Sequence, residues 1–300
     1  MRVGAWSLFS MDDGARVESI RPSVLRRLFR TYLFDIDGTV WLSEELVPGA
    51  RGEPGEQRRL LPDAKNVIRA LRSHGCRVAF MTNNADGTRE SFAQELSDLG
   101  IPCAPDAVVC TAFVMARYLS SQQPGSRCYV IGPDPLREEL CRAGLTLRDR
   151  PGEIDFVVVG IDRDFTYHKL QTAFEAIRAG ARLVATNPDL WVPAAHGDLA
   201  DIGALIAAIE AASQHKLDKL VGKPDPFIVQ VALEGLGVDV ADCLIVGDQL
   251  ETDVLAGRRA GVAVALLLRD PRVVARLPDW QDQPDFLLEN LRGLLVQHPT

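Results

Sequence analysis

The amino-acid sequence predicts an α/β protein built around a mostly parallel sheet. Short apolar runs rich in strand-forming residues alternate with segments of helical spacing, which is typical of βαβ units. No internal repeat or low-complexity tract interrupts this alternation. The predicted strands are YLF (32–34), RVAFM (77–81), CYVIG (128–132), FVVVG (156–160), RLVAT (182–186), CLIVG (243–247) and VAVALLL (262–268).

Helices are predicted between these strands wherever apolar residues recur at intervals of three and four positions. Two such segments are each followed by a glycine, Gly75 or Gly180, that is expected to end the helix. Their apolar positions are Ala64, Val67, Ile68 and Leu71 in the first and Leu170, Ala173, Phe174 and Ile177 in the second. A third helix is expected to have Pro226 in its first turn and Asp225 as its N-cap.

Composition indicates a soluble globular protein and excludes some classes of partner. Of the 300 residues, 47% are hydrophobic and 25% are charged, which is ordinary for a globular domain. The formal net charge of −8 argues against a nucleic-acid-binding protein, which would carry a basic patch. No apolar run approaches the roughly 18 residues that span a bilayer. We therefore expect neither a nucleic acid nor a membrane as partner.

The cysteines and the first residues of the sequence indicate the cellular compartment in which the protein is expected. The six cysteines are scattered without paired spacing, so a zinc site is not expected. The first 15 residues are too short and too acidic for a signal peptide, and Met11 is an alternative start of translation. Because no export signal accompanies the cysteines, we expect reduced thiols and a cytoplasmic protein.

Two segments in the first part of the chain each have two interpretations. RPSVLRRLFR (21–30) mixes arginines with leucines, which is typical of a membrane-surface helix or of a short helix docked on the domain. We favour the docked helix. VPGARGEPGEQRRLLPDA (47–64) is rich in glycine, proline and charge, and it is interpreted as a surface loop that is either a flap over a site or an insertion.

Polar residues suited to binding phosphate or metal follow several predicted strands or open a predicted helix. They are Asp35 and Asp37 in DIDGT, Thr82, Asn83 and Asn84 in TNN, Lys223 in GKP, and Asp248 and Asp253 in GDQLETD. Taken one at a time, each has an ordinary explanation as a turn, helix-cap or surface residue. In open α/β sheets, however, ligands bind beyond the carboxyl ends of the strands. We therefore expect these residues to converge on one crevice.

The pair Asp35 and Asp37 raises a question of charge. Side chains two residues apart on a strand share a face, and like charges so placed repel unless a cation or a proton lies between them. Phosphoryl transfer through a carboxylate explains the pair, because one aspartate attacks phosphorus while the other moves protons. An anionic carboxylate that attacks an anionic phosphate needs positive charge nearby, which a lysine and Mg²⁺ on oxygen ligands would supply.

The motifs DIDGT, TNN, GKP and GDQLETD, in this order, resemble the four motifs of the haloacid dehalogenase (HAD) superfamily. The segments VVVGIDRDFTY (157–167), GARLVATNPD (180–189) and VGKPDP (221–226) are similar to its large-cap phosphatases. That branch includes 4-nitrophenyl, phosphoglycolate, pyridoxal and bacterial nucleotide phosphatases. The resemblance covers roughly residues 32–295.

This resemblance implies a domain organisation. A Rossmann-like parallel-sheet core would be interrupted by a large α/β cap. The cap would close over the site and contact the leaving group of the substrate, which determines specificity. The implied parts are an N-terminal extension (1–30), a catalytic core (31–111 and 216–300) and a cap (112–215). Relatives often self-associate through the cap, so a homo-oligomer is also implied.

The resemblance further implies a role for each motif residue. Asp35 would be the nucleophile, Asp37 the general acid and base, and Lys223 the cation that neutralises the phosphoryl group and orients Asp35. Phosphate binding is implied for Thr82, Asn83 and Asn84. A Mg²⁺ cofactor would be bound by Asp35, by the main-chain carbonyl of Asp37 and by Asp248. Asp253 would support the metal through its waters or through Lys223.

In the implied cap, ATNPDLWVPAAHG is the predicted specificity loop. Its candidates for substrate contact are Asn187, Asp189, Trp191 and His196. Packing inside the cap is the alternative for Trp191, and simple exposure is the alternative for His196. The sequence departs from its relatives at Ala85, at residues 200–203, in the longer 47–64 loop and in LLLRDPRV after the last predicted strand, without removing a catalytic group.

The sequence therefore predicts a Mg²⁺-dependent phosphatase that hydrolyses a small phosphate monoester through an aspartyl-phosphate. A phosphotransferase or phosphomutase of the same fold is an alternative within this chemistry. A catalytically idle protein that binds a phosphorylated metabolite is an alternative from a different class. Phosphoglycolate, glycerol phosphate, a nucleoside monophosphate and pyridoxal phosphate all remain open as substrates.

Overall fold

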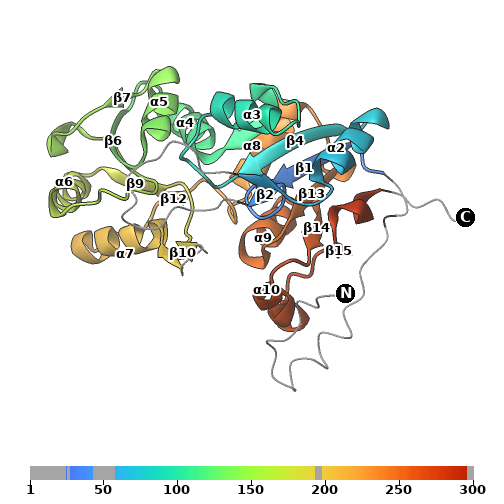
Figure 1. Ribbon diagram of the computed structural model, residues 1–300. Helices are drawn as coiled ribbons and strands as arrows, with labels where there is room; N and C mark the ends of the chain where they lie inside the picture. Colours follow the sequence, from blue (N-terminus) through green and yellow to red (C-terminus); the bar gives the residue numbers. More distant parts are fainter. Residues whose placement is uncertain (1–24, 26–27, 43–57, 193–197, 296–300) are drawn as a thin grey trace, which may run out of the picture.

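A six-stranded parallel sheet, called the core sheet below, organises one half of the protein (Figure 1). The structure is a computed structural model that describes residue 25 and residues 28–42, 58–192 and 198–295. The strand order is β15-β14-β13-β1-β4-β5, and every neighbouring pair runs parallel. The strands are β1 (Thr31–Asp35), β4 (Arg77–Thr82), β5 (Val108–Cys110), β13 (Cys243–Gly247), β14 (Ala263–Leu267) and β15 (Phe286–Leu288).

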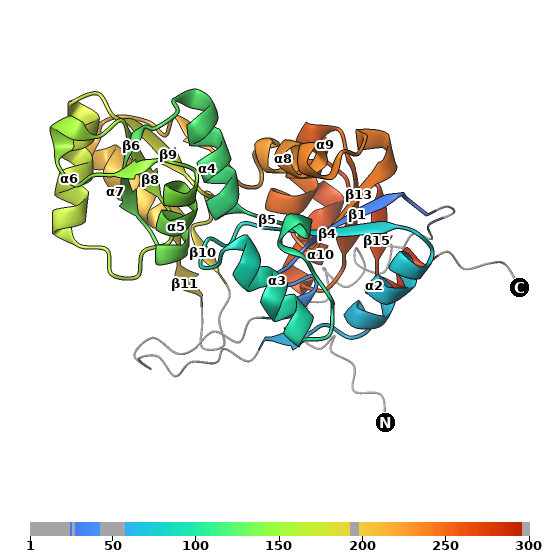
Figure 2. The same cartoon turned by 90° about the horizontal axis from the view of Figure 1, so that it is seen from above.

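A second parallel sheet has the strand order β12-β9-β8-β6-β7. In the sequence, its strands come between β5 and β13 of the core sheet. Its strands are β6 (Arg127–Ile131), β7 (Thr146–Leu147), β8 (Phe156–Val159), β9 (Arg182–Ala185) and β12 (Lys219–Leu220). Figure 2 shows the two sheets in separate lobes. Two short antiparallel pairs also form, β2 (Trp41–Leu42) with β3 (Arg59–Leu60), and β10 (Trp191–Val192) with β11 (Leu199–Ala200). The predicted α/β fold with an inserted second part is confirmed.

Helices cover both sheets. They are α2 (Ala64–Ser73), α3 (Arg89–Asp98), α4 (Thr111–Gln122), α5 (Asp134–Arg142), α6 (Tyr167–Arg178), α7 (Ile202–Ser213), α8 (Phe227–Leu236), α9 (Leu255–Ala260) and α10 (Pro271–Arg276). Single turns of 3₁₀-helix occur at Pro105–Ala107, Pro151–Glu153, Val240–Asp242, Leu277–Asp279 and Leu291–Leu294, and a π-helical turn at Leu250–Val254. In Figure 2, α8 and α9 lie on one face of the core sheet and α2 and α3 on the other.

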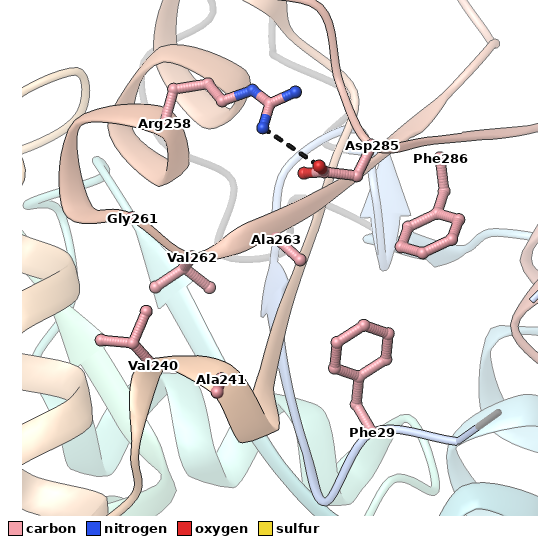
Figure 3. A pocket seen from close by; sticks show the side chains of 9 residues that line it. All are labelled: Phe29, Val240, Ala241, Arg258, Gly261, Val262, Ala263, Asp285 and Phe286. Carbon is pink, nitrogen blue, oxygen red and sulfur yellow. Dashed lines mark hydrogen bonds and ion pairs between the residues drawn. The ribbon is translucent and has the colours of Figure 1, made fainter.

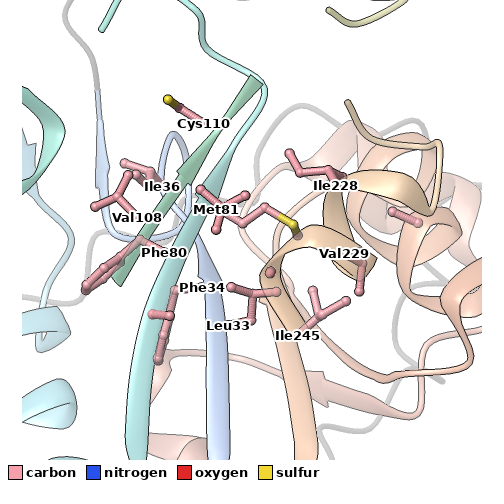
Figure 4. Packing of buried hydrophobic residues seen from close by; sticks show 14 of the residues in the cluster. Leu33, Phe34, Ile36, Phe80, Met81, Val108, Cys110, Ile228, Val229 and Ile245 are labelled. Carbon is pink, nitrogen blue, oxygen red and sulfur yellow. The ribbon is translucent and has the colours of Figure 1, made fainter. Parts of the chain in front are cut away.

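The strands of the core sheet are apolar because both of their faces are covered. All five residues of β1 are buried, and Leu33 lies opposite Ile245 of the neighbouring strand β13. Figure 4 shows Leu33 and Ile245 packed toward Ile228 and Val229 of α8. In the second sheet, alternate residues of β8 join different clusters, so that this strand too is buried on both faces.

The helix predictions from spacing hold, with one correction at a helix start. The four apolar positions predicted for the first helix are the buried residues of α2, and Gly75 follows its end with a positive φ of 80°. The predicted cap of α8 is wrong by one residue, because Pro226 is the N-cap. Asp225 nevertheless accepts a hydrogen bond of 2.9 Å from the backbone N–H of Phe227. A side chain one residue before the cap thus satisfies a free N–H group of the first turn.

Some predictions concern residues outside the described part of the chain. These are the alternative start at Met11, most of the 21–30 helix, most of the 47–64 loop, and His196. Among the described residues, no helix has both the length and the apolar character needed to cross a membrane.

Candidate active site

The predicted site residues meet at the carboxyl edge of the core sheet. Because β13, β1 and β4 are neighbours, their C-terminal ends lie side by side. Asp35 ends β1, Thr82 ends β4, and Asp248 follows β13 directly. This is the edge at which parallel α/β sheets bind ligands. The predicted convergence of these strand ends is therefore present in the structure.

Lys223 is the buried cation of the site. Its Nζ donates to Asp35 Oδ1 at 2.5 Å and to Asp253 Oδ1 at 2.7 Å. Its side chain is only 3% exposed, so these two hydrogen bonds are shielded from solvent. Burial opposes the charge of Lys223, but Asp253 and Asp35 together raise its pKa above the ordinary value. Lys223 is therefore a fixed positive charge between two carboxylates.

Asp253 is held in place by the backbone around it. Its Oδ2 accepts hydrogen bonds of 3.1 Å from the N–H groups of Asp248 and Gln249. The close packing also requires Gly247, since a Cβ there would lie 2.2 Å from Asp253 Cγ. With its other oxygen on Lys223, Asp253 connects the lysine to the turn that carries Asp248.

Three buried carboxylates form a cluster that can hold a cation. Asp35, Asp248 and Asp253 each offer an oxygen, and these oxygens lie within 4.8 Å of one another. Asp35 Oδ2 is buried and has no hydrogen-bond partner among the described residues. Burial raises the pKa of Asp35, against the effect of Lys223 and with that of the other two carboxylates. Burial and Asp253 likewise raise the pKa of Asp248 to about 7, although Arg269 and Lys223 lower it. A cation would relieve this excess of negative charge.

Asp37 lies in a different environment from Asp35. Its Oδ1 accepts a hydrogen bond of 2.8 Å from Trp41 Nε1, and its Oδ2 accepts one of 3.3 Å from Thr82 Oγ1. Trp41 is fully buried, and a tight turn over residues 36–41 returns it to Asp37. The sequence analysis did not assign Trp41 to the site. Its position directly after DIDGTV was the available signal.

The side chain of Asn83 contacts the backbone of Lys223. Asn83 Nδ2 donates to the carbonyl of Lys223 at 2.9 Å, and Asn83 Oδ1 accepts from its N–H at 2.8 Å. The N–H of Asn84 donates to Thr82 Oγ1 at 3.0 Å, and Asn84 Oδ1 accepts from the N–H of Asp86 at 2.7 Å. The side chains of Asn83 and Asn84 are thus engaged by the protein itself, and their implied role in phosphate binding stays a prediction.

Two of the predicted residues of the inserted part reach this site. Asn187 is buried, and its Nδ2 donates to the carbonyl of Asn83 at 3.3 Å. The N–H of Asp189 donates to Asn187 Oδ1 at 3.1 Å, so Asp189 lies next to Asn187. Burial raises the pKa of Asp189, while Lys223 and the side chain of Asn83 lower it. Trp191 is half exposed and lies against Arg272 of α10, whose guanidinium carbon is 5.5 Å from the ring centroid.

Arg269 is a site residue that the sequence analysis missed. Its Nη2 lies 3.5 Å from Asp248 Oδ2, and its Nε donates to the carbonyl of Gly38 at 3.0 Å. Gly38 has a φ of 91°, and a Cβ there would lie 2.4 Å from Asp248 Oδ2. The segment LLLRDPRV was noted only as a departure from relatives. The end of β14, next to β13, was the signal that Arg269 belongs to the same edge.

A cavity of about 400 Å³ lies at the opposite edge of the core sheet. It is lined by residues that precede or begin the strands, among them Phe29, Ala263 and Phe286 (Figure 3). The catalytic candidates all lie at the carboxyl edge, so this cavity does not belong to the site described above.

Two protein-family models match this chain, and together they cover the strands of the core sheet. A family model described as haloacid dehalogenase-like hydrolase matches residues 32–146. A second one, described as HAD-hydrolase-like, matches residues 220–294. The first range contains Asp35, Asp37 and Thr82, and the second contains Lys223 and Asp248.

Named relatives and solved structures are similar over most of the chain. An acid sugar phosphatase of Staphylococcus haemolyticus is 32% identical over 263 residues, which cover 88% of this chain and 94% of the relative. A 4-nitrophenylphosphatase from Thermotoga maritima has 30% identity and a TM-score of 0.79, with 90% of this chain and 98% of that chain covered. A p-nitrophenyl phosphatase from Archaeoglobus fulgidus has 28% identity and a TM-score of 0.78, with 89% and 98% covered.

Proposed function

Because this chain belongs to the haloacid dehalogenase-like hydrolases and is a phosphatase, hence a phosphoric monoester hydrolase, we propose that it acts through a phosphoaspartate on Asp35. The observation that carries this proposal is the buried contact of Lys223 Nζ with Asp35 Oδ1 at 2.5 Å. A lysine so placed fixes the direction of the carboxylate and offers positive charge to an incoming phosphate.

Mg²⁺ is the proposed cofactor. The donor set fits it, since every candidate ligand is oxygen, and Asp35 Oδ2 is buried and has no hydrogen-bond partner within the described part of the chain. Asp35 and Asp248 would hold the ion together with the main-chain carbonyl of Asp37, and Asp253 would support it through Lys223. When bound, the ion supplies positive charge to the phosphoryl oxygens and favours the anionic form of the carboxylates.

In the first step, a carboxylate oxygen of Asp35 attacks phosphorus. The bond from phosphorus to the ester oxygen breaks, and Asp37 gives its proton to the leaving alkoxide. In the second step, Asp37 takes a proton from the attacking water, and the acyl-phosphate bond breaks to release inorganic phosphate and the free carboxylate of Asp35. Lys223 and the hydroxyl of Thr82 are proposed to stabilise the phosphoryl oxygens in both steps.

The substrate is proposed to be a small phosphorylated metabolite. Relatives named acid sugar phosphatase and p-nitrophenyl phosphatase support this class of substrate. The inserted part, whose sheet includes β12 (Lys219–Leu220) beyond the predicted range 112–215, would act as the cap, with Asn187 and Asp189 contacting the leaving group. The position of Asn187, whose Nδ2 lies 3.3 Å from the carbonyl of Asn83, supports this role.

Trapping the intermediate tests the mechanism, because the proposed roles of Asp35 and Asp37 differ in time. Asp35→Asn should abolish turnover of 4-nitrophenyl phosphate and leave no phosphoenzyme. Asp37→Asn keeps the nucleophile but cannot activate water, so it should release about one equivalent of nitrophenolate and then stall. General acid and base catalysis contributes about 10²–10⁴-fold, so alkyl phosphates should react slowly in both steps. Rapid-quench kinetics and mass spectrometry measure both outcomes.

A control variant and a chelator complete this test. Asp98→Asn changes an exposed carboxylate on α3 and should leave turnover unchanged, since among the described residues the Asp98 side chain accepts its hydrogen bond from Gln94, away from the site. Full turnover in excess chelator would contradict the metal assignment. A phosphate found on Asp37, or an Asp35→Asn enzyme that is still active, would contradict the mechanism.

A further inference from the structure

Arg269 connects three loops at the carboxyl edge of the core sheet. It follows β14 directly, donates from Nε to the carbonyl of Gly38 at 3.0 Å, and places Nη2 at 3.5 Å from Asp248 Oδ2. The segments that carry these three residues follow β14, β1 and β13, which are neighbours in the sheet. The guanidinium therefore lies at the carboxylate cluster, beside Asp248.

The two oxygens of Asp248 have different surroundings. Oδ2 faces Arg269 and is pressed against Gly38, where a Cβ would come within 2.4 Å of it. Within the described part of the chain, Oδ1 accepts one long hydrogen bond, of 3.4 Å, from Thr39 Oγ1. Arg269 therefore covers one oxygen of Asp248 and leaves the other for a further positive charge.

Lys223 does not neutralise Asp248 by direct contact. Its Nζ is committed to Asp35 and Asp253, at 2.5 and 2.7 Å. Among the ion pairs of the described residues, the one that contains Asp248 is its pair with Arg269. Without a metal, Arg269 thus supplies the direct ion pair of the third carboxylate, while Lys223 acts on it without contact.

We propose that Arg269 is a built-in counter-ion that stabilises Asp248 in the metal-free enzyme and competes with the divalent cation, so that it sets the affinity for Mg²⁺. This inference rests on the metal-dependent reaction proposed above. A positive charge beside a ligand carboxylate repels an incoming cation and weakens its binding. Arg269 is a positioning residue in this proposal, and it touches neither phosphate nor leaving group.

The alternative is that Arg269 only braces Asp248. Loss of a brace would weaken metal binding, typically by about 10–100-fold. The structure argues against a dominant brace, because the backbone of Asp248 is already held by Asp253 at 3.1 Å and its carboxylate by contact with Gly38. The charge of Arg269 should therefore matter more than its hydrogen bond.

Three substitutions separate charge from bracing. Arg269→Gln removes the charge and keeps a donor for Gly38, Arg269→Met removes both, and Arg269→Lys keeps the charge. Calorimetric titration of MgCl₂ into chelator-treated protein should show about three- to tenfold tighter binding to the Gln and Met variants. The Lys variant should stay within about twofold of wild type. The two neutral variants should melt at lower temperature than wild type when no metal is present.

A matched control lies at the opposite edge of the same sheet. Arg258 is similarly exposed, pairs with Asp285 at 3.0 Å and donates to the backbone carbonyl of Gln283 at 2.7 Å (Figure 3). Arg258→Gln should therefore lower the melting temperature without changing the affinity for Mg²⁺. Salt gives a second readout, because added KCl should shrink the difference between wild type and the Gln variant.

The outcomes distinguish this inference from the proposed function. If wild type binds no Mg²⁺, the metal assignment is overturned, and the inference with it. If wild type binds Mg²⁺ and the Gln and Met variants bind it equally or more weakly, the function stands and the counter-ion role of Arg269 is overturned.

Discussion

The two aspartates of DIDGT occupy different surroundings although one residue separates them. Asp35 shares a buried lysine with Asp253, whereas Asp37 accepts hydrogen bonds from Trp41 and Thr82. Pairs of carboxylates whose environments diverge in this way are typical of sites that assign them different chemical roles. The divergence supports Asp35 as the nucleophile and Asp37 as the group that moves protons.

Asp201 is a single residue whose burial predicts how stability changes with pH. It is buried at the start of α7, and burial is the largest cause that raises its pKa from 3.8 to about 6. Asp189 and Asp86 raise it further, while the N–H of Ile202 and Arg163 lower it. The ionised form is therefore disfavoured in the folded protein. The resulting loss of stability is absent below about pH 4, grows as the pH rises to about 6, and is complete above that.

We therefore expect Asp201→Asn to stabilise the protein by about 1–3 kcal/mol above pH 6 and by nothing near pH 3.5. Asn is as good an N-cap as Asp, so the helix start should be kept. Urea unfolding of both proteins across this pH range measures the difference. Asp270→Asn is a control of opposite sign, because Arg272 holds the pKa of Asp270 below its ordinary value despite burial. A pH-independent effect of Asp201→Asn would contradict the assignment.

Between elements, Asn83 joins the end of β4 to the turn before α8. Its amide makes two hydrogen bonds with the backbone of Lys223, 140 residues later in the chain. The lysine side chain can point steadily at Asp35 only if its backbone is fixed. Asn83 therefore has a positioning role, in addition to any contact of its backbone with phosphate.

We expect Asn83→Ala to lower kcat by about tenfold or more and to destabilise the fold by about 1–3 kcal/mol, because two buried backbone groups lose their partners. Steady-state kinetics and thermal unfolding measure these effects. Asn290→Ala is the matched control, since among the described residues the Asn290 side chain accepts one hydrogen bond, from the N–H of Arg292 in the turn Leu291–Leu294. The control should lose some stability and no activity. An unchanged kcat in Asn83→Ala would show that Lys223 is held by other contacts.

The sequence predicted long elements well because burial on both faces leaves continuous apolar runs. All seven predicted strands exist, whereas β5 and β15, with three residues each, carry too short a pattern to be recognised. The motif aspartates and Lys223 could be placed because each follows or precedes a strong apolar run. Trp41 and Arg269 could not, since their roles depend on a six-residue turn and on which strands are neighbours. Neither property is encoded in local spacing.

At the scale of the whole molecule, the two lobes meet through exposed polar pairs as well as through packing. Arg142 of α5 pairs with Glu90 of α3 at 2.7 Å, and Arg163 pairs with Asp86 at 3.3 Å. These pairs are exposed, and each is worth about 1 kcal/mol or less. Contacts this weak can break and reform as a substrate enters, so the distance between the lobes need not be fixed.

Arg272 makes the contact between α10 and the β10–β11 hairpin. Its guanidinium lies over Trp191, with 5.5 Å from its carbon to the ring centroid, and 3.9 Å from Asp198. An exposed cation–π contact contributes about 0.5–1 kcal/mol and an exposed ion pair a similar amount. Asn187 and Asp189, the proposed substrate contacts, lie just before β10, so loss of this contact should weaken substrate binding more than it slows the chemical step.

We therefore expect Arg272→Gln to raise KM for a sugar phosphate by about two- to fivefold with kcat nearly unchanged. Arg276→Gln is the control, because Arg276 lies on the same helix but pairs with Glu251. Trp191→Leu should raise KM as well, and the double variant should raise it by less than the product of the two single effects, since both remove one shared contact. KM values from initial rates on all four proteins and wild type give the comparison. Effects that multiply would mean that Arg272 and Trp191 act independently, which would contradict a role for their contact in substrate binding.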